Sequence, residues 1–367
     1  MDPISRRSFL ACSAAVAVAP RLALGRQDSL QWHDVKSWGV EGKGWTETIR
    51  TFDRFPSKAE KAIPPAVWNL SRHSAGMLVR FETDAAAIHA RWSLLNAGLA
   101  LPHMPATGVS GLDLYARDEQ GRDRWLAVAK PTAQKMELRL AGGVDPLPGG
   151  KKRLYTVYLP LYNGTDSLEI GVDPKAAFAP VAPRQEKPIV FYGTSILHGA
   201  CASRPGMAFP AILGRRFGRP TINLGFSGNG RMEPEVGALL AELDPCLYAL
   251  DCLPNMSAEQ VAERTEPFVR RLRKARPETP ILLVEDRTFT SAPFLKASRD
   301  AHAARRAAYR KAHEKLLADG VKALAYLEGE ALLGDDGEGA TDGSHPNDLG
   351  MARYADAYEK EMRKLLR

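Results

Sequence analysis

The strongest constraint on the fold is the regular alternation of short apolar runs with longer helical patterns that begins near residue 189. This alternation is typical of parallel α/β sheets, in which each helix leads the chain back to start the next strand. The pattern predicts a three-layer α/β/α domain with a five-stranded parallel sheet. The expected strands are 189–192, 221–224, 247–251, 281–285 and 323–327, and the expected helices are 207–217, 233–243, 258–275, 301–319 and 350–366.

The chain before this region has a different periodicity. Between residues 31 and 173, apolar and polar residues mostly alternate over short runs such as 76–83 and 153–158, and turn signals such as Asn163-Gly164 separate the runs. Alternation with a period of two indicates strands that have one buried face. We therefore expect an antiparallel β-sandwich ahead of the α/β domain.

The first 25 residues are predicted to be a twin-arginine signal peptide. Arg6-Arg7 precedes an apolar run at 10–19, and small residues at 23–25 suit a cleavage site. The run is shorter than the roughly 20 residues that span a bilayer. We expect export to the periplasm or the cell exterior, with no stable membrane insertion once the signal is removed.

The remaining chain is predicted to have three parts. Residues 26–177 are assigned to the sandwich and residues 189–367 to the α/β domain. The segment 178–188 contains three prolines and is interpreted as a linker.

Charge and cysteine content exclude several classes of function. The formal net charge is +7, but charges of both signs mix along most helices, so a nucleic-acid partner is not expected. Three cysteines follow the signal (Cys201, Cys246 and Cys252), and an odd number argues against a disulfide framework. The sequence contains none of the common zinc or calcium spacings, so we expect neither a metal nor another cofactor.

Polar residues with complementary chemistry follow the predicted strands. Ligands of parallel α/β sheets bind beyond the carboxyl ends of the strands. Ser195 follows the first strand, Gly228 the second and Asn255 the third, while Asp342 and His345 share the loop before the last helix. Each residue alone has a structural interpretation, since serine, for example, often caps a helix. Together they supply the groups that acyl transfer requires.

Each residue has a predicted role in that chemistry. Ser195 would be the nucleophile, His345 the general base and Asp342 the carboxylate that orients the imidazole. The oxyanion hole would consist of the backbone N–H groups of Ser195 and Gly228 and the side-chain amide of Asn255. The sequence contains no Gly-x-Ser-x-Gly motif, which argues against an α/β-hydrolase nucleophile elbow.

These blocks resemble those of the SGNH (GDSL-like) hydrolases. The matching elements are Gly193-Thr194-Ser195, Gly228, Asn255 and Asp342-x-x-His345, with threonine where the family motif has aspartate. The segment 101–115 resembles the GxDLY-type N-terminal domain of one subgroup. The resemblance implies a serine esterase that uses the residues assigned above.

The resemblance also suggests a substrate. Exported SGNH enzymes with an additional β-sandwich resemble carbohydrate esterases that remove acetyl groups, so we expect a short-chain acyl ester of a small molecule or polysaccharide. The small or polar residues that flank the catalytic ones are expected to form a short acyl pocket: Thr194, His198, Cys201, Ser227 and Asn229. The loop 100–115, which contains His103, has two interpretations: it reaches the mouth of the active site, or His103 is a buried structural histidine, which is slightly favoured. Two alternatives stay open, an acyltransferase that uses the same serine and a non-catalytic carbohydrate-binding protein.

Overall fold

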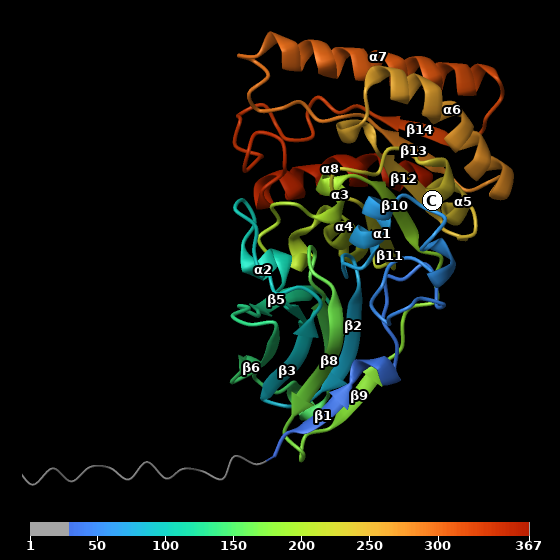
Figure 1. The fold of residues 1–367 in the computed structure, drawn as a ribbon. Helices are drawn as coiled ribbons and strands as arrows, with labels where there is room; N and C mark the ends of the chain where they lie inside the picture. Colours follow the sequence, from blue (N-terminus) through green and yellow to red (C-terminus); the bar gives the residue numbers. More distant parts are fainter. Residues whose placement is uncertain (1–28, 367) are drawn as a thin grey trace, which may run out of the picture.

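The computed structural model describes residues 29–366, which form a β-sandwich and a helix-covered parallel sheet (Figure 1). The predicted signal peptide lies outside the described residues, so it stays a prediction. Within 29–366, none of the helices combines the length and apolar character needed to cross a membrane.

The sandwich consists of two antiparallel sheets. One sheet has the strand order β1-β8-β3-β6 and the other has the order β5-β4-β7-β2-β9. Side chains such as Trp92, Leu114 and Ile170 fill the space between the sheets and are almost fully buried. The antiparallel sandwich expected from the alternating pattern is confirmed. The strands are β1 (Gln31–Asp34), β2 (Leu78–Thr83), β3 (Ala87–Leu94), β4 (Asp113–Arg117), β5 (Asp123–Val128), β6 (Lys135–Gly142), β7 (Arg153–Tyr158), β8 (Thr165–Val172) and β9 (Phe178–Val181).

The first residues of the predicted linker are part of this sandwich. Phe178–Val181 form the edge strand β9, which pairs only with β2. An edge position tolerates Pro180, because a strand at the edge can lack one N–H without breaking a ladder on both sides.

The second domain contains the predicted five-stranded parallel sheet. Its strand order is β11-β10-β12-β13-β14, and every neighbouring pair is parallel. The strand of this domain that comes first in the sequence therefore lies inside the sheet, and later strands pair with it on both sides. The strands are β10 (Ile189–Gly193), β11 (Thr221–Gly225), β12 (Leu247–Asp251), β13 (Ile281–Val284) and β14 (Leu324–Leu327), close to the predicted runs.

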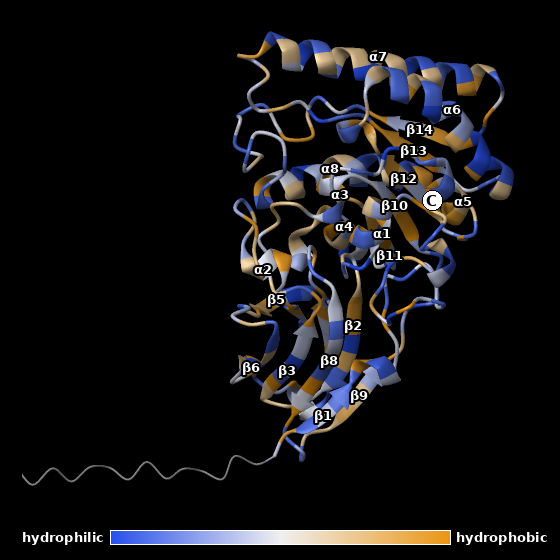
Figure 2. Cartoon of the chain, viewed as in Figure 1, coloured by the Kyte–Doolittle hydropathy of each residue, from blue (hydrophilic) through white to orange (hydrophobic). Residues whose placement is uncertain are grey.

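Helices cover both faces of the parallel sheet, which confirms the three-layer architecture. Successive residues of β10 point to opposite cores: Phe191 packs with α4 and α8, and Tyr192 packs with α5 and α6. Figure 2 shows the apolar character of these strands. The helices are α3 (Ser195–His198), α4 (Phe209–Phe217) and α8 (Asp348–Leu365) on one face, and α5 (Pro234–Leu240), α6 (Ala258–Ala275) and α7 (Lys296–Ala318) on the other.

A segment from the N-terminal half also packs on the parallel sheet. Phe55 and the helix α1 (Pro65–Ser71), through Val67 and Trp68, join the core beside β11 and α5. The sequence prediction placed these residues with the sandwich, because the segment carries too short a helix to give a clear period. The two domains are therefore joined by a shared apolar core as well as by the chain connection.

Asp251, the last residue of β12, is a buried carboxyl group whose ionisation should affect the stability of the fold. Its side chain is fully buried and accepts a hydrogen bond from the Tyr358 hydroxyl at 2.8 Å. Burial raises the pKa of Asp251 from 3.8 to about 7. Between about pH 4 and pH 7 the Asp251 carboxyl is therefore ionised in the unfolded chain but largely protonated in the folded chain. The free energy of unfolding falls as the pH rises through this window.

The substitution Asp251→Asn should remove this pH-dependent loss. Near pH 4 it should have little effect, and above pH 7 it should raise the free energy of unfolding by at most on the order of 4 kcal/mol. Urea unfolding at both pH values measures the difference. Asp244→Asn, at an exposed aspartate preceding the same strand, should show no such gain. An equal gain at both pH values would contradict the titration of Asp251.

Candidate active site

The proposed nucleophile lies at the carboxyl end of the inner strand β10. Ser195 is the first residue of α3, and its side chain emerges where the strand turns into the helix. The turn requires Gly193, because a Cβ there would lie 2.1 Å from the carbonyl oxygen of Asp251 on β12. As the first helical residue, Ser195 has a backbone N–H without an acceptor inside the helix.

The structure brings Ser195, His345 and Asp342 into one hydrogen-bonded chain. The Ser195 Oγ lies 2.9 Å from Nε2 of His345. On the other side of the ring, Nδ1 lies 2.7 Å from Oδ2 of Asp342. This order leaves Nε2 able to take the serine proton, provided that Nδ1 carries the ring hydrogen.

The loop that carries His345 is shaped by Asp342 itself. Its Oδ1 accepts hydrogen bonds from the backbone N–H groups of Ser344 at 3.0 Å and His345 at 2.8 Å. Partial burial raises the pKa of Asp342, but the hydrogen bonds from His345 and Ser344 outweigh it and lower the pKa to about 2. The carboxylate is thus ionised and held in position to orient the imidazole.

The predicted oxyanion residues lie on two adjacent loops. Gly228 has a φ of +68°, and the loop that carries it is tied to the nucleophile turn by the Phe226 N–H, which donates to the Gly193 carbonyl at 2.9 Å. From the end of β12, the Asn255 Nδ2 donates to the Asn229 carbonyl at 2.7 Å. Because an amide nitrogen carries two hydrogens, one remains for another acceptor. Asn255 therefore braces the Gly228 loop as well as offering a donor.

The substitution Asn255→Ala should reduce kcat by roughly 10²–10³, the loss typical of removing one oxyanion donor. KM should change less, because the donor acts on charge that develops in the transition state. Steady-state kinetics on an acetyl ester measure both constants. Asn69→Ala in α1, at an exposed asparagine, is the control. A loss confined to KM would contradict the oxyanion assignment.

Arg54 is a buried residue that the sequence analysis did not single out. Its guanidinium donates to the carbonyls of Asn223 at 3.2 Å and Gly225 at 2.7 Å, and lies 4.7 Å above the ring of Phe226. Burial lowers its pKa to about 9. Arg54 thereby connects the N-terminal half to the strand end that leads into the Gly228 loop.

A second arginine supports the loop of the proposed base. Arg287, which follows β13, contacts both the hydroxyl and the carbonyl of Ser344 and pairs with Asp286. The Thr290 N–H also donates to the Gly343 carbonyl at 3.0 Å. The loop between Asp342 and His345 is therefore held from the neighbouring strand end, a role that no sequence motif indicates.

Two sequence-based interpretations of residues near the nucleophile are wrong. His103 is exposed, and its ring centroid lies 5.8 Å from that of His345, because a bridge between Leu101 and Met104 places His103 at the tip of a tight turn. Conversely, Thr194 and His198 are fully buried and line no acyl pocket. The His198 ring stacks on Tyr162 at 4.0 Å, beneath the nucleophile turn.

Two family models match the chain and together span nearly all described residues. The model of the GDSL-like lipase/acylhydrolase family matches residues 186–363. A GxDLY model, described as the N-terminus of SGNH-hydrolase-type esterases, matches residues 30–178. A solved structure from Bacteroides ovatus, named as a GDSL-like lipase, is 35% identical with a TM-score of 0.87, and the match covers 92% of this chain and 98% of that one. The chain belongs to the GDSL-like lipase/acylhydrolase family.

Two more distant structures show the same fold over most of this GDSL-like chain. The salicylyl-acyltransferase SsfX3 from a tetracycline biosynthetic pathway is 21% identical, with a TM-score of 0.73 and coverage of 92% of this chain and 97% of that one. An acetyl xylan esterase from Butyrivibrio proteoclasticus is 12% identical, with a TM-score of 0.55 and coverage of 92% and 98%. No curated protein matches the sequence. The family supports acyl-ester hydrolysis as the general activity.

Proposed function

We propose that this GDSL-like hydrolase is an exported serine esterase that removes short acyl groups, chiefly acetyl, from carbohydrate. The observation that carries the catalytic part is the hydrogen-bonded chain from Ser195 through His345 to Asp342 at the carboxyl ends of the sheet. A serine hydroxyl that shares a hydrogen bond with an oriented imidazole is the arrangement that activates serine for attack.

The proposed reaction proceeds through an acyl-enzyme. Ser195 Oγ bonds to the ester carbonyl carbon while its proton passes to Nε2 of His345. The negative carbonyl oxygen is stabilised by the N–H groups of Ser195 and Gly228 and by the Asn255 amide. Collapse breaks the bond to the alcohol, which leaves with the proton from His345. Water then attacks the acyl group with the same base, releasing the acid and restoring the serine.

The surroundings of the proposed site favour a polar alcohol. A hollow of about 440 Å³ is lined by Cys201, which has a potential ligand atom within 4.8 Å of one on His345. Its lining is largely polar: Ser203, Glu338, Asn347 and Asp348, with Leu349. Hydroxyl-rich ligands find hydrogen-bonding partners in such a lining, whereas a long acyl chain gains little apolar contact. The acetyl xylan esterase with the same fold is consistent with a sugar ester.

We expect kcat/KM to be highest for acetyl esters and to fall as the acyl chain lengthens. A lipase cleft would instead supply roughly 0.8 kcal/mol for each buried methylene. Para-nitrophenyl esters with acyl chains of about two to ten carbons span a range over which that gain would accumulate visibly. A maximum at the long end would reject a carbohydrate deacetylase and favour a lipid ester.

Acetate release from acetylated polysaccharides tests the alcohol, and adding sugar acceptors to the same assay tests for acyl transfer. An acceptor that captures the acyl group faster than water would favour the acyltransferase alternative. Binding of glycans without ester cleavage would favour the non-catalytic carbohydrate-binding alternative.

A further inference from the structure

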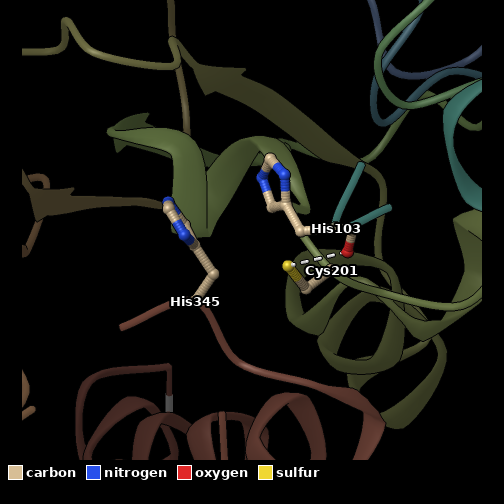
Figure 3. A group of neighbouring side chains, drawn as sticks. All are labelled: His103, Cys201 and His345. Atoms are coloured by element: carbon tan, nitrogen blue, oxygen red, sulfur yellow. Dashed lines mark hydrogen bonds between the residues drawn. The ribbon is translucent and has the colours of Figure 1, made fainter. Parts of the chain in front are cut away.

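Three metal-ligating side chains meet beside the proposed nucleophile. His103 comes from the N-terminal half, Cys201 from the loop after α3 and His345 from the loop before α8 (Figure 3). One potential ligand atom from each lies within 4.8 Å of the other two. Cys201 is buried, whereas the other two side chains are open to solvent to different degrees.

The set has the chemistry of a transition-metal site. Two imidazoles and a thiolate are ligands that Zn²⁺ prefers. Tetrahedral zinc, with bonds of about 2.0–2.3 Å, needs ligand atoms roughly 3.3–3.7 Å apart. The present separations are at most 4.8 Å, so closing the set requires shifts on the order of 1 Å. Side-chain rotation of exposed His103 can supply its share of these shifts.

His345 already has the hydrogen-bonding partner that zinc-binding histidines use. Its Nδ1 lies 2.7 Å from the Asp342 carboxylate, so Nε2 is the nitrogen that would bind a metal, in place of its present contact with the Ser195 hydroxyl at 2.9 Å. Histidines that bind zinc commonly donate their other N–H to a carboxylate in this way. The same carboxylate adds negative charge next to the site.

We propose that His103, Cys201 and His345 bind Zn²⁺ or a similar thiophilic divalent cation, and that the bound cation reversibly inhibits the enzyme. The inhibition rests on the proposed function, because it requires His345 to be the general base. A cation on Nε2 occupies the lone pair that would accept the Ser195 proton. The metal is therefore an inhibitor at this position and supplies no step of the esterase reaction.

Binding also changes the state of the cysteine. The Cys201 thiol currently contacts the His103 carbonyl, with Sγ and O 3.5 Å apart. Coordination replaces the S–H bond by a metal–sulfur bond and releases the proton to solvent. The two histidines bind as neutral rings.

Zinc titration of the full chain, first freed of metal with a chelator, tests the proposal. Calorimetry should report one zinc ion per chain. Cobalt(II), used as a coloured substitute, should give a thiolate-to-metal absorption band. Hydrolysis of p-nitrophenyl acetate should fall as the site fills and recover when EDTA is added. The chelator-treated enzyme should be fully active before zinc is added.

Substitution of the two non-catalytic ligands identifies the site. His103→Gln should keep basal esterase activity, and His103→Gln and Cys201→Ser should each weaken zinc binding at least 10–100-fold, roughly the loss that even outer-shell changes cause. Cys246→Ser, at another free cysteine, and His89→Gln, in strand β3, should leave zinc sensitivity unchanged. If Cys201→Ser does not fold, Cys201→Ala and His103→Gln provide the same comparison.

The two readouts separate failure of this proposal from failure of the proposed function. An active esterase whose zinc affinity is the same in Cys201→Ser and His103→Gln would overturn the metal site. One-to-one zinc binding that depends on both residues, in a chain without esterase activity, would support the site and reject the catalytic role of His345. Zinc binding that depends on both residues but leaves esterase activity unchanged would overturn the inhibition.

Discussion

Replacing Ser195 with alanine is expected to reduce ester hydrolysis by about 10⁶-fold, as loss of the nucleophile does in other serine hydrolases. The reason is the geometry at the end of β10: the Ser195 Oγ is the group 2.9 Å from Nε2 of His345, and alanine leaves the imidazole with no hydroxyl to activate. The residual rate should reflect the oxyanion donors and substrate binding alone. Steady-state assay with p-nitrophenyl acetate measures the loss.

Two controls separate loss of chemistry from loss of fold. Ser195→Ala should unfold at nearly the same urea concentration as the unsubstituted chain, because the change removes one oxygen and leaves the buried packing of α3 in place. It should also fail to react with a serine-directed phosphonate. Ser93→Ala in sandwich strand β3, at a partly buried serine, should retain both activity and labelling. Undiminished turnover in Ser195→Ala would reject the catalytic assignment as a whole.

The parts of the fold that the sequence predicted correctly have local causes. The strand β10 reads as an apolar run because both of its faces are buried, and α6 spans the predicted residues 258–275 because Ser257 and Gln260 form a capping box at its start. Where such a signal is missing, the ends move: α7 begins at Lys296, before the predicted start at residue 301, and its N-cap Leu295 makes no side-chain capping bond.

In the candidate site too, the features that have a local sequence signal were predicted and those without one were not. Asp342 and His345 are three residues apart, so a single loop could be expected to hold both, and strand ends gather Ser195 and Asn255 at one edge of the sheet. The contacts of Arg54 are not local, because the Asn223 carbonyl that accepts its hydrogen bond is 169 residues away in the sequence. Such contacts depend on how the two halves of the chain pack, which no local pattern encodes.

His103 illustrates how an isolated residue type misleads. A lone histidine between apolar residues is more often buried than functional, and that general expectation favoured the structural interpretation. The outcome depends on the bridge between Leu101 and Met104, which turns the side chain out toward His345. The exposure of His103 thus follows from one backbone pairing whose register the sequence alone does not specify.

The substitution Asp342→Asn is expected to lower kcat by about 10⁴ while leaving the loop largely intact. The amide oxygen can still accept the backbone N–H groups of Ser344 and His345, which now bind Oδ1 at 3.0 and 2.8 Å. The amide nitrogen, however, would face Nδ1 as a donor. The ring would then carry its hydrogen on Nε2, where it blocks acceptance of the Ser195 proton.

The control for Asp342→Asn is Asp336→Asn. Asp336 also precedes α8, and its carboxylate pairs with Arg353. Its removal should leave kcat near that of the unsubstituted chain. Because the pKa of Asp342 is lowered to about 2, this group stays ionised at ordinary assay pH, so its protonation should not limit the parent enzyme.

The double variant with Ser195→Ala provides the decisive comparison. If Asp342 acts only through His345 and Ser195, adding Asp342→Asn to Ser195→Ala should cause little further loss, because residues that work as one unit are not additive. A full additional loss of about 10⁴-fold in the double variant would show that the carboxylate acts on the substrate directly. It would contradict the role proposed for Asp342, which is to orient His345.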